Sequence, residues 1–258
     1  WWIGEGIDFI IRTYAITFII ALIASQNLIR YGNNSRSNNQ ALRDREAFAA
    51  VALAWPPIVL LGAIPFWLGG MFFGPFEFYT EEANFTQLLQ GSLHSWFESM
   101  SGFTTTGATV IDFSTSPNCT IDVTDCIASQ SQSLLLWRSL TQWLGGMGVI
   151  MLGLLILSRV LGGGMSLAKA ELTGPTLSRL GPTLQSTARR LWLIYTLLTI
   201  IEMGALYFIG GMGAFDAVNY SLTTLPSGGF GTSDSGIMGF ESAIIESILI
   251  VFMLLTCI

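Results

Sequence analysis

Long apolar runs separated by short polar connections constrain the fold of this 258-residue chain more than any other feature. A helix that crosses the hydrocarbon core of a bilayer needs about 20 mainly apolar residues. Four runs of this kind lie near residues 8–28, 47–70, 134–158 and 189–211, and a fifth begins near Glu241. Charged residues make up 11% of the chain, whereas ordinary soluble domains carry about 25%. The sequence therefore predicts an all-α membrane protein.

Two shorter apolar segments lie between these runs and cannot span the bilayer. One extends from Gln87 to Met100 and the other from Asp216 to Thr224, and a helix advances only about 1.5 Å per residue. Both are predicted to be re-entrant helices, because non-helical backbone at membrane depth is tolerated only where protein or water surrounds it. The second long run also contains Pro56-Pro57, which should kink its helix.

Each short helix is followed by a loop rich in Thr, Ser and Gly. The first loop reads Thr104-Thr-Thr-Gly-Ala-Thr109 and the second reads Ser227-Gly-Gly-Phe-Gly-Thr232. The order of span, short helix, loop and span occurs twice, with Gly107 and Gly228 separated by 121 residues. This is the pattern of an internal repeat, and membrane repeats place ion sites where they meet.

These loops carry the residue types that a dehydrated monovalent cation requires. Backbone carbonyls replace lost water ligands without net charge, and Gly permits the φ values that turn successive carbonyls to one axis. The C-terminal ends of the short helices add a partly negative field. Ordinary turns are the alternative for either loop alone, but the pair favours a cation filter. The candidate ion-binding residues are Thr105, Thr106, Gly107 and Ala108 in the first loop and Ser227, Gly228 and Gly229 in the second.

The basic residues set the expected orientation in the membrane. Of 11 Lys and Arg, four lie between the first and second runs and five between the third and fourth, and none lies between Arg45 and Arg138. The positive-inside rule places the Arg-rich connections in the cytoplasm. The glycine-bearing loops then open outside a multi-pass protein of the plasma membrane.

Two charged residues lie close to the first loop. Glu98 falls in the first short helix, and Arg138 begins the long helix behind it. An unpaired charge at membrane depth is costly, so we expect Arg138 to pair with Glu98 or with Asp112 and to support the filter. Snorkelling of Arg138 to the interface is the alternative. Cys119 and Cys126 lie on the expected outer side, where an oxidising compartment would permit a disulfide; the sequence leaves this open.

Three stretches resemble the Trk/Ktr/HKT superfamily of potassium transporters. Residues 101–110 resemble its first pore loop, residues 137–148 resemble the following helix of the Trk branch, and residues 227–232 resemble its second pore loop. The resemblance implies a TrkH-like subunit in which four helix–pore loop–helix repeats surround one pore in a pseudo-fourfold, potassium-channel-like arrangement. It further implies homodimers and a cytoplasmic nucleotide-binding regulatory partner.

Under this resemblance the chain is expected to be a fragment, because it starts without Met and stops inside an apolar run. It would hold the end of an N-terminal region and two of the four repeats. The expected divisions are an N-terminal helix and cytoplasmic loop (1–46), a first repeat (47–160), a cytoplasmic linker (161–188) and a truncated second repeat (189–258).

The resulting functional prediction is potassium uptake across the cell membrane, with K⁺ as the transported ion. Sodium or non-selective cation transport by the same architecture is the alternative, and Gly107 favours potassium by resemblance. An intramembrane hydrolase built on Ser227 would need a base in reach, and the single histidine, His94, belongs to the other loop. A structural scaffold would not need re-entrant loops. We therefore expect no enzyme activity, no cofactor and no nucleic-acid partner, with the lipid bilayer as the surroundings.

Overall fold

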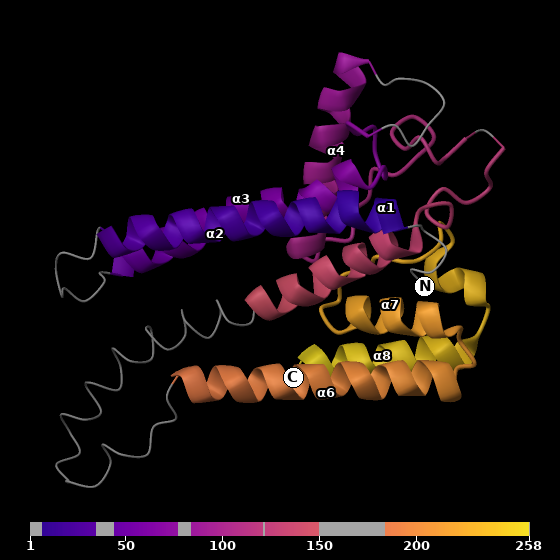
Figure 1. The fold of residues 1–258 in the computed structure, drawn as a ribbon. Helices are drawn as coiled ribbons and strands as arrows, with labels where there is room; N and C mark the ends of the chain where they lie inside the picture. The colour runs from indigo at the N-terminus through magenta and orange to yellow at the C-terminus, as the bar shows by residue number, and fades with distance from the viewer. Residues whose placement is uncertain (1–6, 35–43, 77–83, 121, 150–183, 258) are drawn as a thin grey trace, which may run out of the picture.

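The computed structural model describes residues 7–34, 44–76, 84–120, 122–149 and 184–257, and all regular structure in them is helical (Figure 1). One helix occupies residues 132–149. The other elements are α1 (Ile7–Ile10), the π-helical η1 (Ile11–Ala15), α2 (Ile16–Asn34), α3 (Asp44–Leu68), α4 (Phe85–Phe103), α6 (Leu184–Phe208), α7 (Ala214–Thr224), the 3-10 helix η3 (Gly236–Phe240) and α8 (Ala243–Cys257).

The long helices coincide with the predicted apolar runs. Within the described residues, Ile11–Gly32 and Ala188–Phe208 are long and apolar enough to cross a membrane, and Ala52–Leu68 and Ala243–Thr256 are shorter apolar helices. The third run is helical as far as residue 149, and its last nine positions, with most of the predicted cytoplasmic linker, lie outside the described residues.

Two details of the long helices add to the sequence prediction. The fifth helix begins at Ala243, close to the predicted Glu241, because Glu241 adopts a left-handed φ of 45° that ends η3. In α3, Pro56 and Pro57 lie inside one continuous helix. Membrane helices tolerate such prolines when neighbouring groups satisfy the freed backbone atoms.

The short helices are where the sequence placed them. The amide of Asn84 donates to Oε1 of Gln87 at 2.8 Å and so fixes the start of α4, which runs three residues beyond the predicted Met100. Figure 1 shows α4 crossing α3 rather than lying along it, whereas α6, α7 and α8 lie alongside one another.

The helix over residues 132–149 joins these two groups. The indole of Trp137 donates to the carbonyl of Gly62 in α3 at 3.0 Å, and the hydroxyl of Ser139 donates to Asn219 of α7 at 2.7 Å. One apolar cluster is shared by this helix, α6, the segment after α7, and α8; its buried members are Met147, Tyr195, Leu225 and Phe252. The helix over 132–149 therefore contacts α3 as well as α6, α7 and α8.

Candidate functional site

The loop after α4, residues 104–111 (the first loop), begins with a tight backbone turn. The amide of Thr105 donates to the carbonyl of Gly102 at 2.9 Å, and the amide of Thr106 donates to the carbonyl of Ser101 at 2.9 Å. These bonds satisfy carbonyls that the end of α4 leaves without helical partners. The chain therefore leaves the helix in a fixed direction.

The loop after α7, residues 226–233 (the second loop), repeats the same turn. The amide of Ser227 donates to the carbonyl of Thr224 at 2.8 Å, and the amide of Gly228 donates to the carbonyl of Thr223 at 2.8 Å. Each donor and each acceptor lies 122 positions after its counterpart in the first loop. The two loops are thus equivalent residue by residue.

Backbone dihedral angles follow the same register. In the first loop φ is 53° at Thr105 and 76° at Gly107, and in the second it is 53° at Ser227 and 85° at Gly229. Left-handed φ values are uncommon for residues other than Gly, so their recurrence at matching positions is specific. Gly107 therefore corresponds to Gly229, not to Gly228 as the 121-residue spacing implied. Two consecutive glycines made the register ambiguous in the sequence, and the hydrogen bonds resolve it.

The carbonyls of the seven predicted ion-binding residues fall into two groups. Ser101 Oγ donates to the carbonyl of Ala108 at 2.6 Å, and Gln142 Nε2 donates to the carbonyl of Gly228 at 2.8 Å. The remaining carbonyls accept no hydrogen bond from the described residues; they belong to Thr105, Thr106, Gly107, Ser227 and Gly229. Five of the seven carbonyls therefore remain available as acceptors.

The two loops approach each other closely at one point. A Cβ atom built on Gly107 would collide with the carbonyl oxygen of Gly228. Only glycine fits here, because the same residue also requires a left-handed φ. The first and second loops are therefore in direct backbone contact.

Behind the loops, Glu98 and Arg138 form a buried ion pair. Nε of Arg138 lies 2.6 Å from Oε1 of Glu98, and the side chains are 2% and 0% exposed. Snorkelling does not occur. Asp112, the other partner considered for Arg138, accepts hydrogen bonds from the hydroxyl and amide of Ser114, and these lower the pKa of its carboxyl group below the usual value.

Each member of this pair also contacts one loop. Glu98 accepts hydrogen bonds from Thr109 Oγ1 at 2.9 Å and from the amide of Val110 at 3.3 Å. Arg138 Nη1 donates to the carbonyl of Gly231 at 3.0 Å, and its guanidinium lies 3.6 Å from the centre of the Phe230 ring. These bonds satisfy both buried charges.

Gln142 is a contact residue that the sequence did not single out. Besides its bond to Gly228, its Oε1 accepts from the amide of Phe230 at 3.2 Å, and the side chain is fully buried. The available signal was its spacing from Arg138, because residues four apart lie on one face of a helix. One face of the helix over 132–149 therefore holds the second loop.

Comparison with known proteins assigns this chain to a family. The profile of the family described as "TrkH: Cation transport protein" matches residues 15–258. The chain belongs to the TrkH family. This is a family of transporters and not of enzymes.

The relatives of this TrkH-family chain carry consistent names. It is 36% identical over 246 residues to the Trk system potassium uptake protein TrkH of Escherichia coli K12, covering 95% of this chain and 44% of that protein. It is also 36% identical over 223 residues to the Trk system potassium uptake protein TrkH of Halomonas elongata, and this match covers 86% of this chain and 40% of that protein. The chain thus spans less than half the length of these curated relatives.

A solved structure agrees. The structure titled as the crystal structure of the potassium transporter TrkH from Vibrio parahaemolyticus matches with a TM-score of 0.67 and 28% identity, over 94% of this chain and 42% of the other. The all-helical fold is therefore that of TrkH.

On the predicted outer side of the TrkH-family chain, a disulfide and two aspartates connect the segments that follow the two loops. The structure joins Cys119 and Cys126, which answers the question that the sequence left open. Asp234, just beyond the second loop, accepts from the amides of Cys126 at 2.7 Å and Ile127 at 3.1 Å. The amide of Asp234 in turn donates to Asp125 at 3.0 Å. The segment after the first loop is thereby tied to the end of the second.

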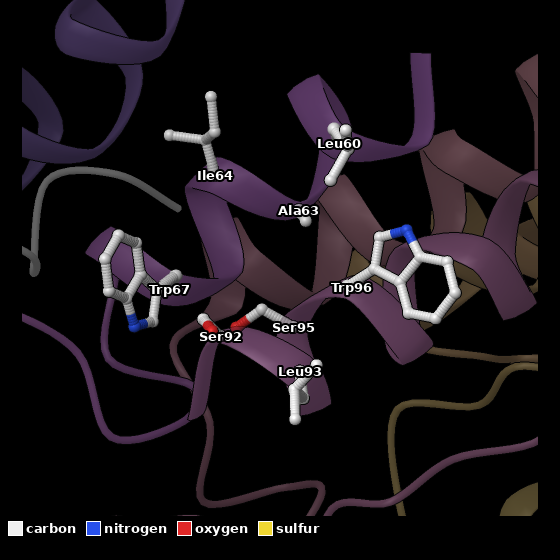
Figure 2. Close-up of a pocket in the computed structure, with 8 residues that line it drawn as sticks. All are labelled: Leu60, Ala63, Ile64, Trp67, Ser92, Leu93, Ser95 and Trp96. Carbon is white, nitrogen blue, oxygen red and sulfur yellow. The ribbon is translucent and has the colours of Figure 1, made fainter. Parts of the chain in front are cut away.

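A pocket of about 450 Å³ lies between α3 and α4 (Figure 2). Its lining is mainly Leu, Ile, Ala and Trp. Its two serines donate their hydroxyls within α4, Ser92 to the carbonyl of Leu89 and Ser95 to that of Gly91, both at 2.8 Å. The pocket offers no ring of free oxygens, so it is not a candidate cation site.

Proposed function

We propose that this chain forms part of a membrane subunit that takes up potassium ions. Three findings support the proposal: membership of the TrkH family of cation transport proteins, relatives named as potassium uptake proteins, and two equivalent loops with free carbonyls. The single observation that carries it is the shared hydrogen-bond and φ pattern at a spacing of 122 residues. Ordinary turns have no reason to share it.

The proposed ligands are the five unoccupied carbonyls of the two loops. An ion that sheds water needs several such oxygens at once, and selectivity depends on their number, field strength and freedom to move. Left-handed φ recurs at every second residue of each loop, a backbone conformation that helps to set the directions of the neighbouring carbonyls. The C-terminal ends of α4 and α7 add a partly negative potential that attracts cations. Ala108 and Gly228 complete the filter backbone with their carbonyls held by the protein.

Two loops cannot enclose an ion alone. The proposal therefore includes four helix–pore loop–helix repeats in a pseudo-fourfold arrangement, of which residues 47–160 and 189–258 supply two. The loops open outside and the Arg-rich connections lie in the cytoplasm, as the distribution of basic residues supports. Glu98 and Arg138 serve as filter supports, because their contacts connect both loops to one buried pair.

Assembly partners are proposed on resemblance alone. A homodimer and a cytoplasmic nucleotide-binding regulatory subunit are expected for the full-length protein. Purification of the tagged full-length protein in mild detergent, followed by mass measurement of the complex, tests both. A mass of one chain excludes the homodimer, and absence of a co-purifying nucleotide-binding protein counts against the regulatory partner.

The function is tested by expressing the full-length protein in a bacterium that lacks its own potassium uptake systems. Growth at low potassium and uptake of Rb⁺ are expected, with much slower uptake of Na⁺. Gly107→Val should abolish growth at low potassium and Rb⁺ uptake, because the valine side chain would collide with the second loop. Gly204→Ala is the matched control, since a Cβ at Gly204 meets nothing within 4 Å. Equal Rb⁺ and Na⁺ uptake would replace the proposal with non-selective cation transport.

A further inference from the structure

We propose that Gln142 is a positioning residue that sets ion preference by holding the carbonyl of Gly228 away from the ion path. The inference depends on the proposed cation transport and concerns a residue that does not itself touch the ion. It assigns to the second loop a ligand set that differs from that of the first.

The geometry of the contact is that of a neighbouring β-strand. Gln142 Nε2 donates to the carbonyl of Gly228 at 2.8 Å, and Gln142 Oε1 accepts from the amide of Phe230 at 3.2 Å. One side-chain amide thus satisfies a carbonyl and an amide two residues apart. Gln142 is 0% exposed, so water does not compete for these bonds.

The loop is shaped to admit this amide. A Cβ on Gly228 would collide with the Gln142 side chain, so the glycine makes room for it. The oxygen of Gly228 also lies against Gly107 of the first loop. It is therefore held between Gln142 and the neighbouring loop and cannot turn without breaking the hydrogen bond.

The equivalent carbonyl in the first loop differs in its hydrogen bonding. Thr106 corresponds to Gly228 at the spacing of 122 residues, and its carbonyl accepts no hydrogen bond from the described residues. The first loop thus offers an oxygen at this level where the second withholds one. Because selectivity depends on the number and field of the oxygens, this difference sets how a small and a large alkali ion are distinguished.

Loss of Gln142 would free the peptide between Gly228 and Gly229. Glycine on both sides gives this peptide unusual rotational freedom, and its oxygen would reach the ion path. A less rigid filter can contract around the smaller ion, so the preference for the larger ion falls. The net strength of the two lost hydrogen bonds corresponds to about a tenfold change in the Rb⁺/Na⁺ flux ratio.

The test uses full-length protein purified and reconstituted into liposomes, with the Rb⁺/Na⁺ flux ratio as the readout. Gln142→Met preserves length and removes both hydrogen bonds. Gln142→Leu also removes both hydrogen bonds, with a branched apolar side chain of similar volume and no added charge. Both variants lose both hydrogen bonds and are expected to lower the ratio about tenfold, and Gln142→Leu supplies the answer if Gln142→Met does not accumulate.

Gln130→Met is the matched control. Gln130 is also buried, at 4% exposure, and its amide donates to Ser116 Oγ at 2.8 Å and the Cys126 carbonyl at 3.0 Å, away from both loops. Its loss should reduce stability and leave the flux ratio unchanged. An unchanged ratio in both Gln142 variants, with a selective wild type, overturns the inference. A wild type that passes no Rb⁺ overturns the proposed function instead.

Discussion

Arg138 Nε and Glu98 Oε1 lie 2.6 Å apart in the interior, and this single ion pair connects equivalent points of two loops. Glu98 contacts Thr109, and Arg138 contacts Gly231, which is the residue 122 positions later. The pair therefore acts as a brace between matching positions in the two repeats. Its loss should affect both loops at once.

Replacing Arg138 by Gln is expected to destabilise the protein by about 3–5 kcal/mol, because it leaves a buried carboxylate without its partner. Rb⁺ uptake should fall below detection in the same cells that tolerate Gly204→Ala. Thermal unfolding of the purified full-length protein measures the first effect and isotope uptake the second. A variant with normal stability and uptake would contradict the role of the brace.

The double variant Glu98→Gln with Arg138→Gln provides the internal control. The stability changes caused by substitutions at two contacting residues do not add. Removal of both charges also leaves no buried charge without a partner. We expect the double variant to be less destabilised than the sum of the two single variants by about 1–3 kcal/mol. Strict additivity would mean that the ion pair contributes little.

Gly107→Ala should be more damaging than Gly229→Ala, although both positions have left-handed φ. Each substitution incurs about 1–2 kcal/mol of backbone strain. Only the Cβ at Gly107 also meets the second loop, whereas that at Gly229 meets nothing within 4 Å. Parallel Rb⁺ uptake assays are the measurement. Equal losses would show that strain, and not contact between the loops, determines the outcome.

The sequence predicted the features that depend on local pattern. Apolar length located the helices, and Thr, Ser and Gly after two short helices located the loops. The cost of a lone charge in a membrane predicted that Arg138 would have a partner, with Glu98 as one of two choices. Each of these follows from residue type and spacing along the chain.

Features that depend on the three-dimensional contacts of particular residues were not predictable from the sequence. The register of the loops required the hydrogen bonds of Ser227 and Gly228, since two adjacent glycines fit either alignment. Gln142 gave only one signal, its four-residue spacing from Arg138, because its partners lie 86 and 88 residues away. Likewise, only tertiary structure showed that the carbonyls of Ala108 and Gly228 are already hydrogen-bonded.

The disulfide gives a direct test of orientation. In intact cells, a membrane-impermeant maleimide should label Cys119 and Cys126 only after treatment with a membrane-impermeant reductant, because the proposed orientation places the disulfide outside. Mass spectrometry of the peptide that contains both residues gives the result, with the Cys119→Ser, Cys126→Ser variant as the unlabelled control. Labelling that requires permeabilised cells would place the loops on the cytoplasmic side.

Glu202 is predicted to tolerate the loss of its carboxylate but not its replacement by a basic residue. It is fully buried in α6, and its oxygens accept no hydrogen bond from the described residues; the hydroxyl of Thr224 donates instead to the carbonyl of Tyr220 at 2.7 Å. Because Gln keeps the shape of the side chain and places no charge in the interior, Glu202→Gln should change stability by less than about 1 kcal/mol. Glu202→Lys should prevent accumulation. Thermal unfolding of the purified variants measures their stability. Equal destabilisation by both substitutions would indicate that the negative charge of Glu202 is required.

The central claim is that carbonyls of the two loops replace the hydration of a potassium ion. Its most direct measurement is isotope flux through the purified full-length protein in liposomes, with Rb⁺ and Na⁺ compared in wild type and Gly107→Val. We predict selective Rb⁺ flux in the wild type and none in the variant. Undiminished, selective Rb⁺ flux in Gly107→Val would contradict the account.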